Sequence, residues 1–250
     1  MKHKLNWRPS RGDFRDHKFL ALQKAKALPQ KVDMRDVYRH VFDQGELGSC
    51  TANAAAGAVG FERAKEDKEG YQASRLFIYY NERVLEGSVN YDSGAQIRDS
   101  INVLYKQGAC REHMWQYDIS EYKIKPTDHC YSSALGFKIK EYLKVDNSNL
   151  NDLKSCLADG FAFIYGFTVF ESFESNEVTE TGFVPMPQVK EKVLGGHAVM
   201  CVGYDDDNQV FICRNSWGSS WGDHGNFYIP YDYLTNTDLA SDFWTIRLVQ

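Results

Sequence analysis

The sequence has no long apolar run and no excess of basic residues. Its longest apolar stretch, residues 160–170, has 11 residues, whereas a membrane-spanning helix needs about 20. The net charge is −5, and no cluster of Lys and Arg stands out as it does in proteins that bind nucleic acid. We therefore expect neither a membrane segment nor a nucleic-acid partner.

Motifs for metals, phosphates and disulfide frameworks are also missing. There is no C-x-x-C, H-E-x-x-H or P-loop pattern, so we expect no metal and no organic cofactor. No apolar segment near the N-terminus resembles a secretory signal. Together with cysteines of unpaired spacing, this favours a reducing compartment such as the cytoplasm, or delivery by a non-classical route. The cysteines are Cys50, Cys110, Cys130, Cys156, Cys201 and Cys213.

A glycine-punctuated loop at residues 44–50 leads into an Ala-rich segment, residues 51–66, whose small and apolar residues predict a helix. Ser49 is a candidate N-cap, which would place Cys50 at the helix start. There the partial positive charge of the helix favours the thiolate and lowers the thiol pKa. Taken alone, the loop is equally compatible with a buried structural thiol.

A predicted hairpin later in the chain carries two further polar side chains. Residues 198–203 and 210–213 predict paired strands around a turn at 205–208. His197 precedes the first strand and Asn215 follows the second, so the two side chains can meet. His197 also follows Cys50 by 147 residues (197 − 50 = 147), which resembles the cysteine–histidine separation of papain-type enzymes. Each residue alone could instead be structural, a core histidine or a turn-forming asparagine.

Three short patterns together resemble the papain and cathepsin family of cysteine peptidases. They read QGxxGSC at residues 44–50, GHAV at 196–199 and NSWGxxWGxxG at 215–225. The resemblance extends from about residue 28 onward. It implies a two-lobed α+β papain-like fold, with a helical lobe, a β-rich and barrel-like lobe, and the active site between them.

The resemblance also implies a role for each site residue. Cys50 attacks the scissile carbonyl, and His197 takes the thiol proton and later protonates the leaving amine. Asn215 orients the imidazole of His197. Gln44 donates its side-chain amide to the oxyanion, together with the backbone N–H of Cys50. Trp217 covers the hydrogen bond between the histidine and the asparagine.

Residues that contact substrate follow from the same resemblance. The segment 92–95 resembles the family's C-x-G-G strip, so Gly94 and Ala95 are expected to pair with the substrate backbone. Gly196 and Ala198 are expected to line a side-chain pocket. The segment 92–95 could also be only a turn.

The sequence departs from the family near the nucleophile. Leu47 and Asp92 stand where the family has two disulfide-forming cysteines, and Thr51 replaces a tryptophan.

The expected domain organisation has three parts. Residues 1–27 form an N-terminal extension, 28–118 a helical lobe with the nucleophile, and 119–250 a β-rich lobe with the histidine and the asparagine. The extension is polar and basic; it could be a surface tail, or it could cover the cleft and restrain activity.

Further elements are expected along the chain. They are helices at 73–86, 95–106 and 149–159, strands at 137–143, 161–170, 225–230 and 239–249, and a charged loop at 171–192.

The function expected from these observations is hydrolysis of peptide bonds by a monomeric thiol endopeptidase, through an acyl-enzyme intermediate. Its substrate would be a peptide or protein. Two alternatives remain open: another acyl transfer by the same triad, such as transamidation, and a non-catalytic or autoinhibited relative that keeps the fold.

Overall fold

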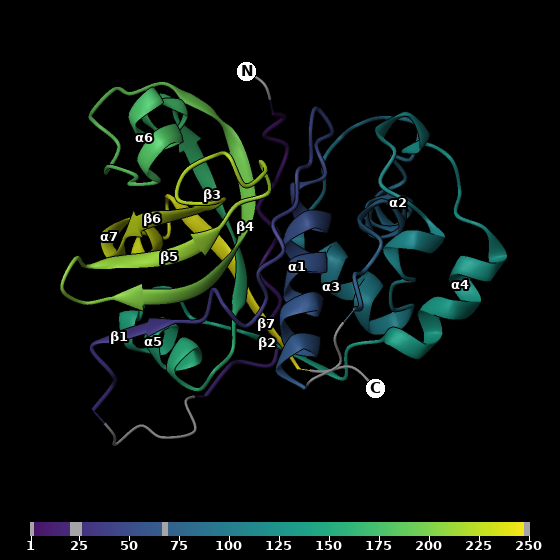
Figure 1. Cartoon of the computed structure of the whole chain (residues 1–250), viewed down its shortest axis with the longest axis horizontal. Helices are drawn as coiled ribbons and strands as arrows, with labels where there is room; N and C mark the ends of the chain where they lie inside the picture. The colour runs from purple at the N-terminus through teal and green to yellow at the C-terminus, as the bar shows by residue number, and fades with distance from the viewer. Residues whose placement is uncertain (1–2, 21–26, 67–69, 248–250) are drawn as a thin grey trace.

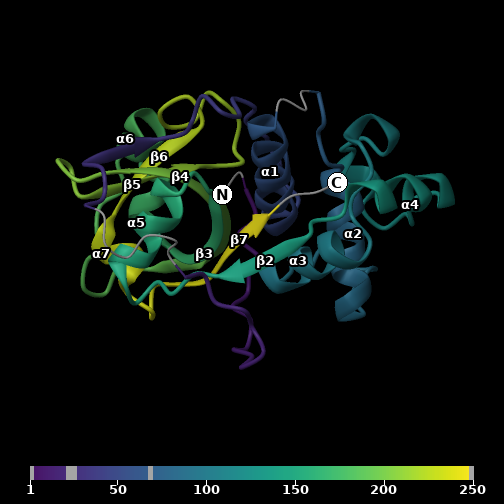
Figure 2. The same ribbon diagram turned by 90° about the horizontal axis from the view of Figure 1, so that it is seen from below.

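A group of helices and a twisted antiparallel sheet lie side by side, as Figure 1 shows for the computed structural model. The structure describes residues 3–20, 27–66 and 70–247. Helix α1 (Cys50–Lys65) lies between the sheet and the other helices (Figures 1 and 2). Its alanines and glycines are buried on nearly every face, so α1 can pack against strand β4 on one side and against α2 and α3 on the other.

The helical lobe contains the three helices predicted between residues 51 and 106, and all three are confirmed. Helix α2 begins after Ser74, whose hydroxyl accepts from the backbone N–H of Phe77, and it ends at Gly87, which has φ +68. The short helix α4 was not predicted, since seven residues are too few for a clear period. The elements are α2 (Arg75–Glu86), α3 (Ile97–Lys106), α4 (Asp128–Ala134) and 3-10 turns at Glu112–Met114, Ile119–Glu121 and Leu135–Phe137.

The sheet has seven strands in the order β2-β7-β3-β4-β5-β6, with β1 beside β4. Among the described residues, the end strands β2 and β6 do not pair, so the sheet is open and the barrel-like expectation is corrected. The strands are β1 (Lys31–Asp33), β2 (Glu141–Lys144), β3 (Phe163–Phe170), β4 (Val193–Asp205), β5 (Val210–Arg214), β6 (Asn226–Pro230) and β7 (Ala240–Arg247).

Helices α5 (Leu150–Ala158), α6 (Asn176–Thr181) and α7 (Tyr231–Thr235) cover the sheet. The predicted loop at 171–192 was partly wrong, because a 3-10 turn and α6 lie within it; the hydroxyl of Ser175 caps α6. The strand predicted at 137–143 begins only at Glu141, since the chain is still in a 3-10 turn at Phe137.

Two apolar cores stabilise the two sides of the molecule. One includes α1–α3, and Cys130 and Ala134 of α4 belong to it. The other lies within the β-rich side. The boundary between a helical lobe ending at residue 118 and a β-rich lobe beginning at residue 119 stays a prediction. Within the described residues, no helix is both long and apolar enough to cross a membrane.

Residues 3–20 run between the helices and the sheet before the chain reaches β1 (Figure 1). Trp7 and Phe19 are buried. The backbone N–H of Ser10 donates to the carboxylate of Asp242 in β7 at 2.7 Å. This N-terminal segment therefore packs against the fold at several points, while Phe14 between them stays exposed.

Candidate active site

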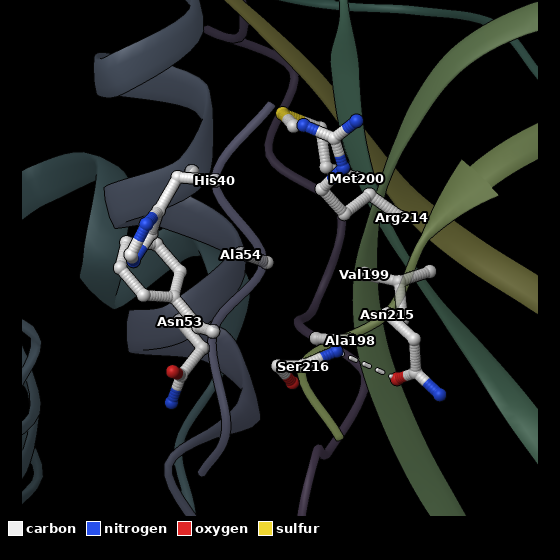
Figure 3. A pocket seen from close by; sticks show the side chains of 11 residues that line it. His40, Asn53, Ala54, Ala198, Val199, Met200, Arg214, Asn215 and Ser216 are labelled. Carbon is white, nitrogen blue, oxygen red and sulfur yellow. Dashed lines mark hydrogen bonds between the residues drawn. The ribbon is translucent and has the colours of Figure 1, made fainter. Parts of the chain in front are cut away.

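Strands β4 and β5 bring His197 and Asn215 together. The Nε2 atom of His197 lies 2.8 Å from Oδ1 of Asn215. That same oxygen accepts the backbone N–H of Ser216 at 2.8 Å, the bond drawn in Figure 3. The second contact orients the Asn215 amide with its oxygen toward the imidazole. The Nδ1 atom of His197 is buried and has no hydrogen-bond partner among the described residues.

Cys50 is the first residue of α1 and is fully buried. Burial raises the pKa of its thiol to about 12, against smaller lowering effects from backbone groups of Ala198, Thr51 and Asn6. The lowered pKa expected at a helix start is therefore not found in this conformation, because loss of solvent outweighs the local dipoles. Ser49 holds the N-cap position, but its hydroxyl contacts Tyr117 at 2.5 Å instead of capping the helix.

His197 is uncharged in the same arrangement. Burial lowers its pKa to about 4, and the hydrogen bond to Asn215 only partly offsets that effect. Both shifts favour the uncharged forms of the thiol and the imidazole while the site is covered.

The indole of Trp217 stacks on His197 at 5.0 Å between ring centroids, with 28° between the planes. The ring of His3 also stacks on Trp217, at 4.8 Å and 6°. Trp217 is only 5% exposed. It shields the imidazole from solvent, and the N-terminal segment in turn covers Trp217.

Gln44 has both ends of its side-chain amide engaged. Its Oε1 accepts the hydroxyl of Ser216 at 2.7 Å. Its Nε2 donates to the carbonyl of Leu47 at 3.0 Å and to that of Lys4 at 3.3 Å. A carbonyl of the chain's own segment therefore lies at the N–H that was predicted to face an oxyanion.

The N-terminal segment also contacts residues that were expected to bind the substrate. The backbone N–H of Trp7 donates to the carbonyl of Gly196 at 3.0 Å, and that of Arg8 donates to Ala95 at 3.3 Å. A Cβ added at Gly94 would lie 1.9 Å from the carbonyl oxygen of Asn6. An extended chain thus pairs with both walls of the site.

The sequence model described as papain family cysteine protease matches residues 28–244. The chain belongs to the papain family of cysteine proteases. An uncharacterized peptidase C1-like protein of Acanthamoeba polyphaga mimivirus is 44% identical over 236 residues, 91% of this chain and 74% of the relative. A cathepsin B-like protein of Giardia intestinalis is 30% identical over 221 residues, 82% of this chain and 70% of the relative.

Solved structures of papain-family proteins have the same architecture. Xylellain, a cysteine protease from Xylella fastidiosa, superposes on this chain with a TM-score of 0.94 at 43% sequence identity. The superposition covers 100% of this chain and 98% of the xylellain chain. Digestive procathepsin L 3 of Tenebrio molitor superposes at 0.72 with 20% identity, covering 95% and 76%, and supports the fold alone.

Several polar residues around this papain-family site were not found from the sequence. Ser216 holds both Asn215 and Gln44, and the hydroxyl of Tyr117 donates to the backbone carbonyl of Gln44 at 2.9 Å. Ser216 lies next to Asn215 in the NSWG pattern, but its contact with Gln44 and that of Tyr117 with Gln44 join residues far apart in sequence, so no local pattern marks those contacts. Asp92 did carry a signal, because it stands at a position where the family has a cysteine.

Proposed function

We propose that this chain is a thiol endopeptidase that hydrolyses peptide bonds through an acyl-enzyme. The observation that carries the proposal is the hydrogen-bonded His197–Asn215 pair. Nδ1 of His197 has no partner among the described residues, and the backbone of the next residue, Ala198, contacts the Cys50 thiol. Cys50 Sγ attacks the carbonyl carbon as its proton passes to Nδ1 of His197. The oxyanion then faces Nε2 of Gln44 and the backbone N–H of Cys50.

Collapse of the intermediate breaks the C–N bond, and His197 returns its proton to the leaving amine. Water, deprotonated by His197, then hydrolyses the thioester and frees Cys50. The cycle needs no atom beyond the substrate, one water and these side chains.

Internal cleavage is favoured by how a chain can lie in this cleft. In the segment 3–8, His3 stacks on Trp217 and Arg8 pairs with Ala95, and the chain continues beyond Arg8. A cleft of this kind accepts the middle of a polypeptide. Pairing through Gly94, Ala95 and Gly196 uses backbone groups, as β-augmentation does, so it tolerates varied side chains. Transamidation or a purely binding role would use the same cleft without net hydrolysis.

The first prediction tests this function directly. An irreversible peptidyl alkylator should label the chain once, at Cys50, with peptide mass spectrometry locating the adduct. A mixed fluorogenic peptide pool, incubated in parallel without an added amine acceptor, should be hydrolysed. Labelling without hydrolysis, but with transfer once an amine is added, would favour transamidation. Labelling spread over several thiols would contradict an assembled triad.

We further propose that residues 1–27 restrain the enzyme, through the part that lies at the site. Support comes from the contacts of residues 3–8 with Gln44, Gly196 and Ala95, which are groups that a substrate would use. Of this extension, residues 1–2 and 21–26 lie outside the described residues.

A second prediction concerns pH. Burial in the covered state lowers the pKa of His197 to about 4, from an ordinary 6.5. The covered state disfavours the imidazolium, so protonation of His197 favours release. The stability of the covered state relative to the released state is therefore fully present above pH 6.5 and is lost as the pH falls toward 4. Release of the segment should increase by at most about tenfold per pH unit in this window. The ¹⁹F NMR signal of fluorotryptophan at Trp7, assigned with Trp7→Phe, would report it.

The control for this prediction is His197→Gln, which keeps a polar side chain but cannot gain the proton. Its Trp7 signal should change much less between pH 6.5 and 4. An equal change in both proteins would show that other groups, such as the carboxylates that pair with the segment, govern release.

A further inference from the structure

Asp92 connects the nucleophile loop, residues 44–50, to the rest of the helical lobe. Its Oδ1 and Oδ2 accept the backbone N–H of Gly48 at 3.0 and 3.2 Å. The hydroxyl of Tyr79 donates to Oδ1 at 2.5 Å. The side chain of Asp92 is only 9% exposed, so these hydrogen bonds form largely away from water. Hydrogen bonds to a charged acceptor are the stronger kind.

The same contacts extend to the substrate strip. The Tyr79 hydroxyl that donates to Asp92 also accepts the backbone N–H of Gly94 at 3.2 Å. One carboxylate and one phenol thus join two backbone groups, at Gly48 and Gly94, from separate loops. Burial is the main cause that raises the pKa of Tyr79 far above its usual range, and the charge of Asp92 adds to it; Tyr79 is therefore a stable donor.

The resemblance to the papain family places Leu47 and Asp92 where that family has two disulfide-forming cysteines. A disulfide there would tie the nucleophile loop to the strip covalently. In this chain the apolar Leu47 is buried, and Asp92 reaches the next residue, Gly48, through hydrogen bonds.

We propose that Asp92 is a positioning residue that replaces this disulfide, holding Gly48, and through it Cys50 and the oxyanion donors, in the reactive arrangement. The inference rests on the proposed function, because it assigns a role in the same reaction. Lys4 pairs with Asp92 at 2.6 Å, but Lys4 belongs to the covering segment and its side chain is 53% exposed. The hydrogen bonds to Gly48 and Tyr79 remain available when the segment leaves.

The test compares Asp92→Ala, Asp92→Asn and Asp146→Ala, each in a Lys4→Ala background. In that background the ion pair to the segment is absent from every protein, so its loss does not confound the comparison. The asparagine keeps an oxygen that can accept from Gly48 and Tyr79. Asp146 is the matched control, since its carboxylate also accepts a backbone N–H, that of Ser148 at 3.0 Å, but lies outside the catalytic and substrate-binding segments.

Two measurements are made on each protein: kcat and KM for a fluorogenic peptide, and deuterium uptake at residues 44–50 by mass spectrometry. Asp92→Ala should lower kcat by about 10- to 100-fold, with a smaller change in KM, because the oxyanion donors act on the transition state. It should also increase uptake at Gly48. Asp92→Asn should restore both to within about threefold, since it retains the acceptor, and Asp146→Ala should match the parent.

Unchanged uptake in Asp92→Ala would overturn the proposal. Increased uptake with unaltered kcat would do so too, because the tether would then be structural only. Uptake does not depend on turnover, so a chain that hydrolyses nothing but still shows the uptake pattern would contradict the peptidase assignment and not the tether.

Discussion

Replacing Cys50 with alanine should abolish peptide hydrolysis, with a loss of kcat on the order of 10⁴-fold or more. Alanine supplies no nucleophile to form the acyl intermediate. The reaction would then depend on direct attack by water, which the oxyanion donors accelerate only modestly. Steady-state hydrolysis of a fluorogenic peptide, at matched protein concentration, measures the effect.

Cys156→Ala is the matched control for the loss of a buried thiol. Cys156 is fully buried, like Cys50, but lies in α5 within the core of the β-rich side. Its removal should leave kcat/KM within about threefold, although it costs some stability through the cavity it creates. Hydrolysis by Cys50→Ala within tenfold of the wild type would assign the nucleophile elsewhere.

Trp7→Ala should raise the rate of Cys50 alkylation by at least about 100-fold. Trp7 is 7% exposed, and a Cβ added at Gly166 would lie 1.9 Å from the indole ring of Trp7. The indole therefore packs directly on the backbone of Gly166. Removing a buried tryptophan typically costs about 3–5 kcal/mol, and each 1.36 kcal/mol changes a population tenfold. If labelling requires release of the segment, the rate increases with the released fraction. Stopped-flow alkylation with a peptidyl reagent measures it.

A chain beginning at Ser10 should be faster still. It lacks the residues that contact Gln44 and Gly196 but keeps the anchors that follow, including the ion pair of Asp16 with Arg98 at 2.6 Å and the buried Phe19. Removal of all 27 residues would also remove those anchors and could lower stability for reasons unrelated to the site.

Phe14→Ala is the control for a change within the same segment, because Phe14 is 98% exposed. Its alkylation rate should equal that of the wild type. Equal rates for Trp7→Ala, the chain beginning at Ser10 and the wild type would sink the idea that the segment restrains the enzyme.

The charge state of the site could not be read from local sequence. A helix start predicts a lowered thiol pKa, yet burial raises the pKa of Cys50 to about 12 and lowers that of His197 to about 4. Desolvation depends on every group that covers the site, including Asn6 and Trp7, which are more than 40 residues away from Cys50 in the chain.

The sequence by itself determined the family, the order of the main helices and strands, and the hairpin that pairs His197 with Asn215. These features follow from short-range patterns: apolar periodicity, glycine punctuation and motif spacing. The short helices α4 and α7 were not predicted, because they have too few residues to show an apolar period.

Only the tertiary structure decided where the N-terminal segment lies, that the sheet stays open, and that Asp92 binds Gly48 and Tyr79. Each depends on contacts between residues far apart in sequence. The energies of such contacts come from burial and hydrogen-bond geometry in three dimensions, and no local pattern in the chain records them.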